Sequence, residues 1–176
     1  MNFDLDRIDF EILDRIQNNA RLSNKELAAA VHLAPSTCLG RVQALRRKGI
    51  LGAVRAEVLP EALGVGLQAL LAVRLKQHGR SQLRAFWKHL RSLPEVRAAF
   101  HVSGAHDFLL HVTVRDSRHL RDFALDAITS RPEVAHLETS LVFDVATNPV
   151  LPSFIATEPA PSKGRRAGPP GPRRVR

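Results

Sequence analysis

Signals for two short helices joined by a tight turn stand close together near the N-terminus. Ser23 can cap the first helix, and Glu26, three residues later, can reach back to the amide of the cap residue. His32 lies in the connection and belongs to the residue types that tolerate positive φ. Pro35 suits the first position of the second helix, and Gly49 suits a left-handed stop after it. The pattern therefore predicts a helix-turn-helix.

The second of these helices is expected to have one buried face and one open face. Cys38, Val42 and Leu45 recur at i, i+4 and i+7, so they should face the core. A second helix of this kind lies in the DNA major groove in helix-turn-helix proteins, but similar pairs also occur in all-α proteins that never touch DNA. If the motif binds DNA, the candidate contacts are Ser36, Thr37, Gly40, Arg41, Arg46 and Arg47. For Arg41 the alternative is a structural pair with an acid of the preceding helix, such as Asp9.

A further helix is predicted before this pair. Asp6 can cap it, and Ile8, Ile12 and Ile16 form an apolar stripe at helical spacing. Residues 1–51 are therefore interpreted as a three-helix domain of the winged-helix or helix-turn-helix type. Residues 52–64 are interpreted as a hinge that contains a short strand.

From residue 65 to residue 150 the periodicity alternates between that of strands and that of helices. The order is strand, helix, strand, strand, helix, strand, which predicts a ferredoxin-like α+β domain with both helices on one face of an antiparallel sheet. The expected strands are 70–76, 96–102, 107–114 and 136–145, and the expected helices are 81–92 and 117–130.

Strict alternation assigns a mixed set of side chains to the other face of this sheet. Such a face suits packing against a second subunit, although it could also be solvated. Its expected members are Ala72, Arg74, Arg97, Ala99, His101, Leu109, His111, Thr113, Ser140 and Val142.

Charge and composition narrow the class of protein further. Residues 158–176 hold six Lys and Arg and one acid, which is over half of the net charge of +9. We expect the Pro-, Gly- and Arg-rich segment 151–176 to be disordered, and to bind DNA phosphates or to remain an inert extension. The sequence contains no run of about 18 apolar residues, so it predicts no membrane span. One cysteine and an acidic N-terminus without a secretory signal predict a cytoplasmic, nucleoid-associated protein.

The order and spacing of these features resemble the Lrp/AsnC family of transcription regulators. The resemblance covers about residues 4–150. It is carried by these motifs: Leu5-Asp6-x-x-Asp9-x-x-Ile12-Leu13, Asn19-Ala20-Arg21, Glu26-Leu27-Ala28, Pro35-Ser36-Thr37, Arg41-Val42-x-x-Leu45, Gly49-Ile50-x-Gly52, Ala56, Pro60, Leu63-Gly64 and Gly104-x-x-Asp107. The departures are His32 in place of Gly, Ala34 in place of a Ser cap, and Gly40 within the second helix of the pair.

The resemblance implies a sequence-specific regulator that binds double-stranded DNA as a homodimer and assembles further, commonly into an octamer. It also implies a small effector, usually an amino acid, bound where neighbouring dimers meet. Asp107 could accept the effector's ammonium, and a Gly-containing turn could donate amides to its carboxylate. The alternative is that Gly104 and Asp107 only form a hairpin turn. The expected ligand residues are Gly104, Ala105, His106, Asp107, Thr139 and Ser140.

Two other functions remain open from the sequence. Relatives with the same two domains include decarboxylases of siroheme-type tetrapyrroles, and His101, His106 and His111 lie near the turn. An architectural DNA-binding protein without a ligand is the second alternative. No Cys and His spacing indicates a metal, and no Gly-rich phosphate loop is present, so we expect neither a cofactor nor enzymatic activity.

Overall fold

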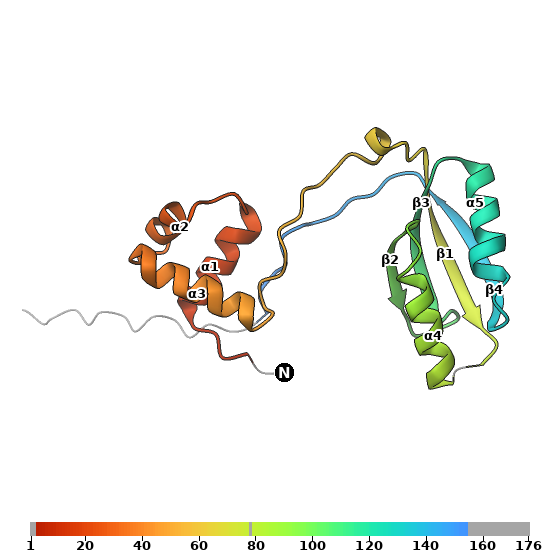
Figure 1. Ribbon diagram of the computed structural model, residues 1–176, viewed down its shortest axis with the longest axis horizontal. Coiled ribbons are helices and arrows are strands. Elements are labelled where there is room, and N and C mark those ends of the chain that lie inside the picture. The colour runs from red at the N-terminus through yellow and green to blue at the C-terminus, as the bar shows by residue number, and fades with distance from the viewer. Residues whose placement is uncertain (1–2, 78, 155–176) are drawn as a thin grey trace, which may run out of the picture. The chain divides into compact units, whose positions relative to one another are not determined.

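A computed structural model describes residues 3–77 and 79–154 (Figure 1). The described chain forms two compact units. One comprises the residues up to 55 together with those from 148 onward, and the other comprises residues 56–147. Each unit has its own hydrophobic core.

The first unit contains the three predicted helices: α1 (Arg7–Asn18), α2 (Asn24–Ala30) and α3 (Pro35–Arg47). Capping boxes begin α1 at Asp6 and α2 at Ser23, whereas Ala34 gives α3 no side-chain cap. His32 has a φ of 55° and Gly49 a φ of 70°, so both predicted left-handed positions are confirmed.

The core of this unit lies between the three helices. Cys38, Val42 and Leu45 of α3 are buried, as the spacing predicted. Asn24 Nδ2 at the start of α2 donates a hydrogen bond of 2.8 Å to the carbonyl of Pro35 at the start of α3. The buried set is Ile12, Leu27, Ala28, Val31, Cys38, Val42 and Leu45.

The segment that follows α3 differs from the prediction. Residues 53–59 form no strand, and a 3-10 turn, η1 (Pro60–Leu63), follows them. The expected strand within 52–58 is therefore wrong for this single chain. An extended segment becomes a strand only when a neighbouring strand satisfies its backbone groups, and the described chain supplies no such partner here.

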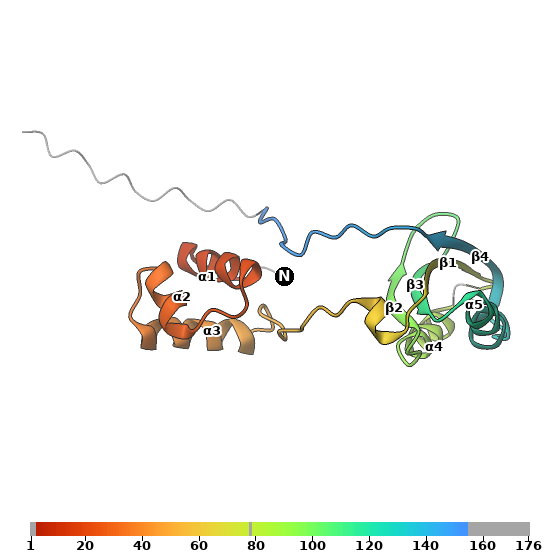
Figure 2. The same ribbon diagram turned by 90° about the horizontal axis from the view of Figure 1, so that it is seen from above.

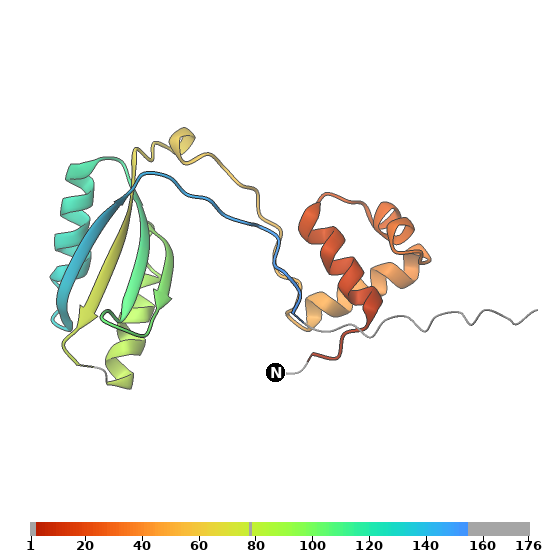
Figure 3. The ribbon, with the colours of Figure 1, turned by 180° about the vertical axis from the view of Figure 1, so that it is seen from behind.

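The second unit is the predicted βαββαβ domain. Its strands are β1 (Leu67–Leu75), β2 (Val96–His101), β3 (Phe108–Val114) and β4 (Val134–Val142), and its helices are α4 (Arg80–Leu90) and α5 (Ser117–Phe123). The antiparallel sheet has the order β2-β3-β1-β4. Both helices lie on one side of the sheet (Figure 2), and the view from behind shows the other side (Figure 3).

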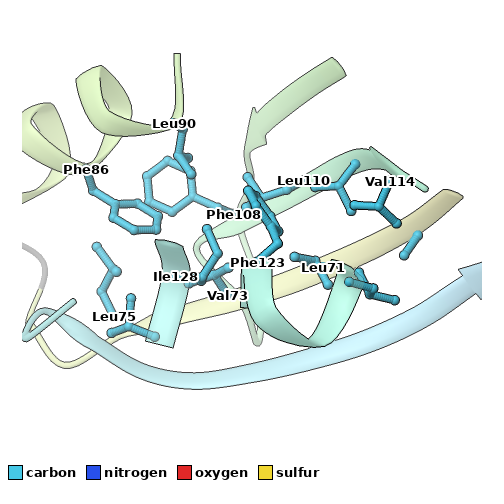
Figure 4. Packing of buried hydrophobic residues seen from close by; sticks show 14 residues of the cluster. Leu71, Val73, Leu75, Phe86, Leu90, Phe108, Leu110, Val114, Phe123 and Ile128 are labelled. Carbon is cyan, nitrogen blue, oxygen red and sulfur yellow. The ribbon is translucent and has the colours of Figure 1, made fainter. Parts of the chain in front are cut away.

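The core of the second unit fills the space between the sheet and the two helices (Figure 4). Leu71, Val73 and Leu75 come from β1, and Phe108 and Leu110 from β3, so the predicted alternation holds in both strands. The helices contribute a second group to this core: Phe86, Leu90, Leu120, Phe123 and Ile128.

Strand β2 breaks the alternation that its sequence predicts. Val96 pairs with Val112, but Ala98 already pairs with His111, so Arg97 is an extra residue in a β-bulge. The residues after the bulge therefore change faces. Their strict-alternation assignment is wrong: Ala99 and His101 face the helices, and Phe100 lies on the open face opposite Leu109.

The last helix spans nearly the predicted residues but changes type, and the last strand begins two residues earlier and ends three residues earlier than predicted. After α5 the chain continues as a π-helical segment, η2 (Ala124–Thr129). β4 ends at Val142, and Phe143 beyond it is 97% exposed.

In the first unit the Leu151 amide donates a 2.9 Å hydrogen bond to Gln17 Oε1 of α1. The rest of the predicted basic tail, from residue 155 onward, lies outside the described residues.

Candidate functional site

The open face of α3 carries almost all of the predicted DNA contacts. Ser36, Thr37, Gly40, Arg46 and Arg47 are exposed. Two exposed neighbours on α3, Leu39 and Gln43, were not among the candidates. Glutamine can read adenine and an apolar side chain can contact a thymine methyl, so their side-chain types could have suggested them.

Arg41 differs from the other candidates because its guanidinium binds two carboxylates of the same unit. Arg41 Nη1 lies 2.7 Å from Asp6 Oδ2 and 2.8 Å from Asp9 Oδ1. The structure therefore shows the alternative that the sequence left open, a pair between α3 and the start of α1.

The pKa of Asp6 reports the same contact. Burial raises this pKa, but the backbone amide of Asp9 donates a hydrogen bond to the carboxylate and Arg41 adds a second hydrogen bond and a positive charge. The result is a pKa below the ordinary value for aspartate. Arg41 is thereby held near the first turn of α1, while Arg46 and Arg47 stay exposed.

The turn between β2 and β3 is the candidate effector site. Gly104 has a φ of 123°, which residues with a Cβ rarely adopt, so this position requires glycine. Asp107 is 8% exposed and is the one buried charged residue of the described chain. Its Oδ2 accepts a 2.7 Å hydrogen bond from the Leu75 amide, and its own amide donates to the Val73 carbonyl. Asp107 therefore fixes the turn against β1.

A histidine and glutamate cluster lies beside this turn. His106 Nε2 is 3.3 Å from Glu138 Oε1 of β4, and His136 Nε2 approaches the same oxygen at 3.3 Å. The hydrogen bond and charge of His106, with a smaller contribution from His136, hold the pKa of Glu138 below its ordinary value. Glu138 and His136 were missed because only the pairing of β4 with β1 brings them to the turn.

The two β4 candidates lie on opposite faces of the sheet. Thr139 pairs with Leu71 on the helix side, whereas Ser140 pairs with Leu70 on the open side. They therefore cannot both point into one site on this unit.

The open face of the sheet carries apolar residues around a hydrogen-bonded histidine. His111 Nε2 lies 2.8 Å from Gln68 Oε1. Burial, and then the positive charge of Arg97, lower the pKa of His111 below its ordinary value, which favours the neutral ring. The apolar residues on this face include Leu70, Phe100, Leu109 and Val142, of which Leu70 and Phe100 are 41% and 55% exposed.

The histidines named for the decarboxylase alternative do not converge. His101 lies on the helix side, His111 on the open face, and His106 contacts Glu138 at the turn. Within residues 3–77 and 79–154, no three His, Cys, Asp or Glu side chains are placed to hold a metal ion. No helix in that part of the chain is long and apolar enough to cross a membrane.

These features define a DNA-binding protein with a helix-turn-helix unit and a separate ferredoxin-like unit. Residues 5–51 match the model of the winged helix-turn-helix DNA-binding domain, and residues 68–149 match the model of the Lrp/AsnC ligand binding domain. The chain therefore belongs to the Lrp/AsnC family of transcriptional regulators.

Individual relatives agree with this assignment. The HTH-type transcriptional regulator AldR of Mycolicibacterium smegmatis is 40% identical over 141 residues, which cover 80% of this chain and 82% of AldR. The leucine-responsive regulatory protein of Rhizobium meliloti is 36% identical over 138 residues, covering 78% and 88%. The crystal structure of a Neisseria meningitidis transcriptional regulator in complex with L-Met has a TM-score of 0.74 and 33% identity, covering 82% of this chain and 93% of that one. These relatives are named as regulators, not as enzymes.

Proposed function

We propose that this protein is a sequence-specific regulator whose assembly and DNA affinity respond to an amino-acid effector. The observation that carries the DNA-reading part is the open face of α3, where hydroxyl, amide and basic side chains stand opposite the buried Cys38, Val42 and Leu45. Hydroxyl and basic groups bind phosphates and base edges, and so they support sequence-specific reading.

The effector part of the proposal rests on the turn that contains Gly104 and Asp107. A zwitterion needs a carboxylate near its ammonium and backbone amides near its own carboxylate, and the turn contains one carboxylate, Asp107, and the backbone amides beside Gly104. The Neisseria relative was solved with L-Met, which supports an amino acid as the effector class. Two copies of the chain, joined through the open sheet face, would form the dimer that assembles further.

Asp107→Asn tests the effector site. The asparagine oxygen can still accept the hydrogen bond from Leu75, but the negative charge is lost. We expect calorimetry with the twenty common amino acids to find at least one that binds the wild type, and the variant to lose that binding while its DNA affinity in the absence of effector is unchanged. If no amino acid binds the wild type, or the variant binds as tightly, the effector proposal is wrong for this turn.

DNA reading is tested separately by gel shifts with promoter DNA and with random DNA of equal length. At near-physiological salt a regulator prefers the promoter, whereas an architectural protein binds both equally. Equal affinities would overturn sequence-specific reading and favour the architectural alternative.

A further inference from the structure

A pocket of about 720 Å³ lies in the second unit between α4 and the adjoining ends of β2 and β3. This volume is in the range of small-molecule sites. Its apolar wall is formed by Leu83 and Trp87, both half-buried, and by the buried Phe108. The remaining lining residues are exposed and polar: Arg84, Lys88, Arg91, Ser92 and His101. We call this the α4 pocket.

The three cations of the α4 pocket form no ion pair within the described residues. Arg84, Lys88 and Arg91 stand at i, i+4 and i+7, so they form one stripe along the helix, and α4 contains no Asp or Glu. Like charges at this spacing destabilise a helix. The helix dipole favours cations near the C-terminal end, but Arg84 lies in the middle of α4. The stripe therefore does not stabilise the helix, and its charges are suited to binding an anion.

Flat aromatic surfaces lie next to this stripe. The ring of His101 stacks on Phe108 at a centroid distance of 5.0 Å, and the Trp87 ring lies 5.8 Å from Phe108. The bulge at Arg97 creates this arrangement, because it turns His101 to the helix side. Rings in this arrangement favour a planar apolar body that packs against them.

The lining also indicates what the pocket excludes. It contains no acidic residue, so the ammonium of an amino acid would meet three positive charges and no acceptor carboxylate. This distinguishes the α4 pocket from the turn at Asp107, where a carboxylate is present.

We propose that the α4 pocket is a second ligand site, which binds aromatic carboxylates that lack an ammonium group. The ring of the ligand packs against Trp87 and Phe108, and its carboxylate binds the cations of the stripe. The site is separate from the proposed amino-acid effector site, and neither requires the other.

Trp87 is the single tryptophan of the chain, so its fluorescence reports on the pocket directly. We would titrate the full-length protein with phenylacetate, phenylacetamide, L-phenylalanine and inorganic phosphate. We expect a saturable fluorescence change with phenylacetate. Phenylacetamide and L-phenylalanine should each bind at least about tenfold more weakly, because the amide lacks the carboxylate and the ammonium of the amino acid is repelled by the cations. Phosphate, which has no ring, should neither change the fluorescence nor displace phenylacetate.

Charge-removing variants then locate the site. Arg84→Gln and Lys88→Gln should each weaken phenylacetate binding about tenfold, whereas Arg80→Gln, on the same helix but outside the pocket, should leave it unchanged. All three residues are exposed, so folding is checked by equal melting temperatures. The proposal is overturned by any of three results: no saturable change with phenylacetate, equal binding of phenylacetamide, or equal weakening by Arg80→Gln. Displacement by phosphate would also overturn it, because the site would then be a general anion site.

Discussion

Arg41 of α3 lies 2.8 Å from Asp9 of α1, and this ion pair joins two residues that are 32 positions apart in the sequence. Asp9 is also the residue that completes the capping box with Asp6 at the start of α1. The same carboxylates therefore cap the start of α1 and bind Arg41 of α3. Arg41 acts first as a structural residue, although its place in the sequence made it a candidate for DNA contact.

We expect Arg41→Ala to lower the free energy of unfolding by about 1 kcal/mol, because it removes a partly exposed ion pair with two hydrogen bonds. The matched control is Arg46→Ala, in the same helix but exposed, which should change stability by less than about 0.5 kcal/mol. Urea unfolding measures both. Equal stability of wild type and Arg41→Ala would contradict the structural role, and a loss of promoter affinity by Arg46→Ala alone would support the division of roles.

The ion pair between Arg41 and Asp6 should make stability depend on acid pH. The pKa of Asp6 is lower in the folded protein than in the unfolded chain, so its contribution is present above about pH 4, the unfolded value, and disappears as the pH falls through the lower folded value. The stability difference between wild type and Arg41→Gln should therefore be full at about pH 7 and should shrink as the pH falls below about 4. Urea unfolding at several pH values gives this difference, and a constant difference would show that the carboxylates do not contribute through Arg41.

The order of elements could be predicted because periodicity is a local property of the sequence. Ser23, Glu26 and Gly49 mark helix ends through their own backbone contacts, and alternating residues mark β1 and β3. The faces of β2 could not be predicted in this way. A single bulge at Arg97 moves every later side chain of β2 to the opposite face of the sheet. The local alternation of the sequence does not indicate the extra residue.

The site was harder to predict than the fold, because its contacts join distant segments. Glu138 meets His106 only through the register of β4 on β1, which no local pattern specifies. Arg41 had two plausible partners in the sequence, DNA phosphates or Asp9, and only the distance between α1 and α3 decides that it binds Asp9 in the free protein. Leu39 and Gln43 likewise became candidates only because the structure shows that both are exposed on the open face of α3.

The open face of the sheet leads to a prediction about assembly. Leu109→Glu would place a carboxylate on this face and, in a dimer packed through it, would bury two like charges without partners. We expect light scattering to show the mass of a single chain for this variant and a larger particle for the wild type. The control is Leu125→Glu in η2, which is already 54% exposed and should keep the wild-type mass. An unchanged mass for Leu109→Glu would rule out this face as the dimer interface.

Gly40 gives a prediction about the stability of α3. It lies inside α3, where glycine is less favourable than alanine by about 0.5–1 kcal/mol, and a Cβ built at this position meets no atom within 4 Å. We therefore expect Gly40→Ala to raise the free energy of unfolding by about that amount, measured by urea unfolding. A loss of stability would show that this position does not behave as an open helix interior.

Gly40→Glu places a negative charge on the same open face. If α3 lies against DNA, this charge faces the phosphates, and promoter affinity should fall by tenfold or more, roughly the effect of losing one good contact. Ala20→Glu is the control, because it makes the same change of net charge at an exposed residue between α1 and α2. The general electrostatic penalty is the same for both variants, so the difference between their affinities depends on where the charge lies. Equal affinities of the two variants in gel shifts would show that the Gly40 face of α3 does not approach DNA.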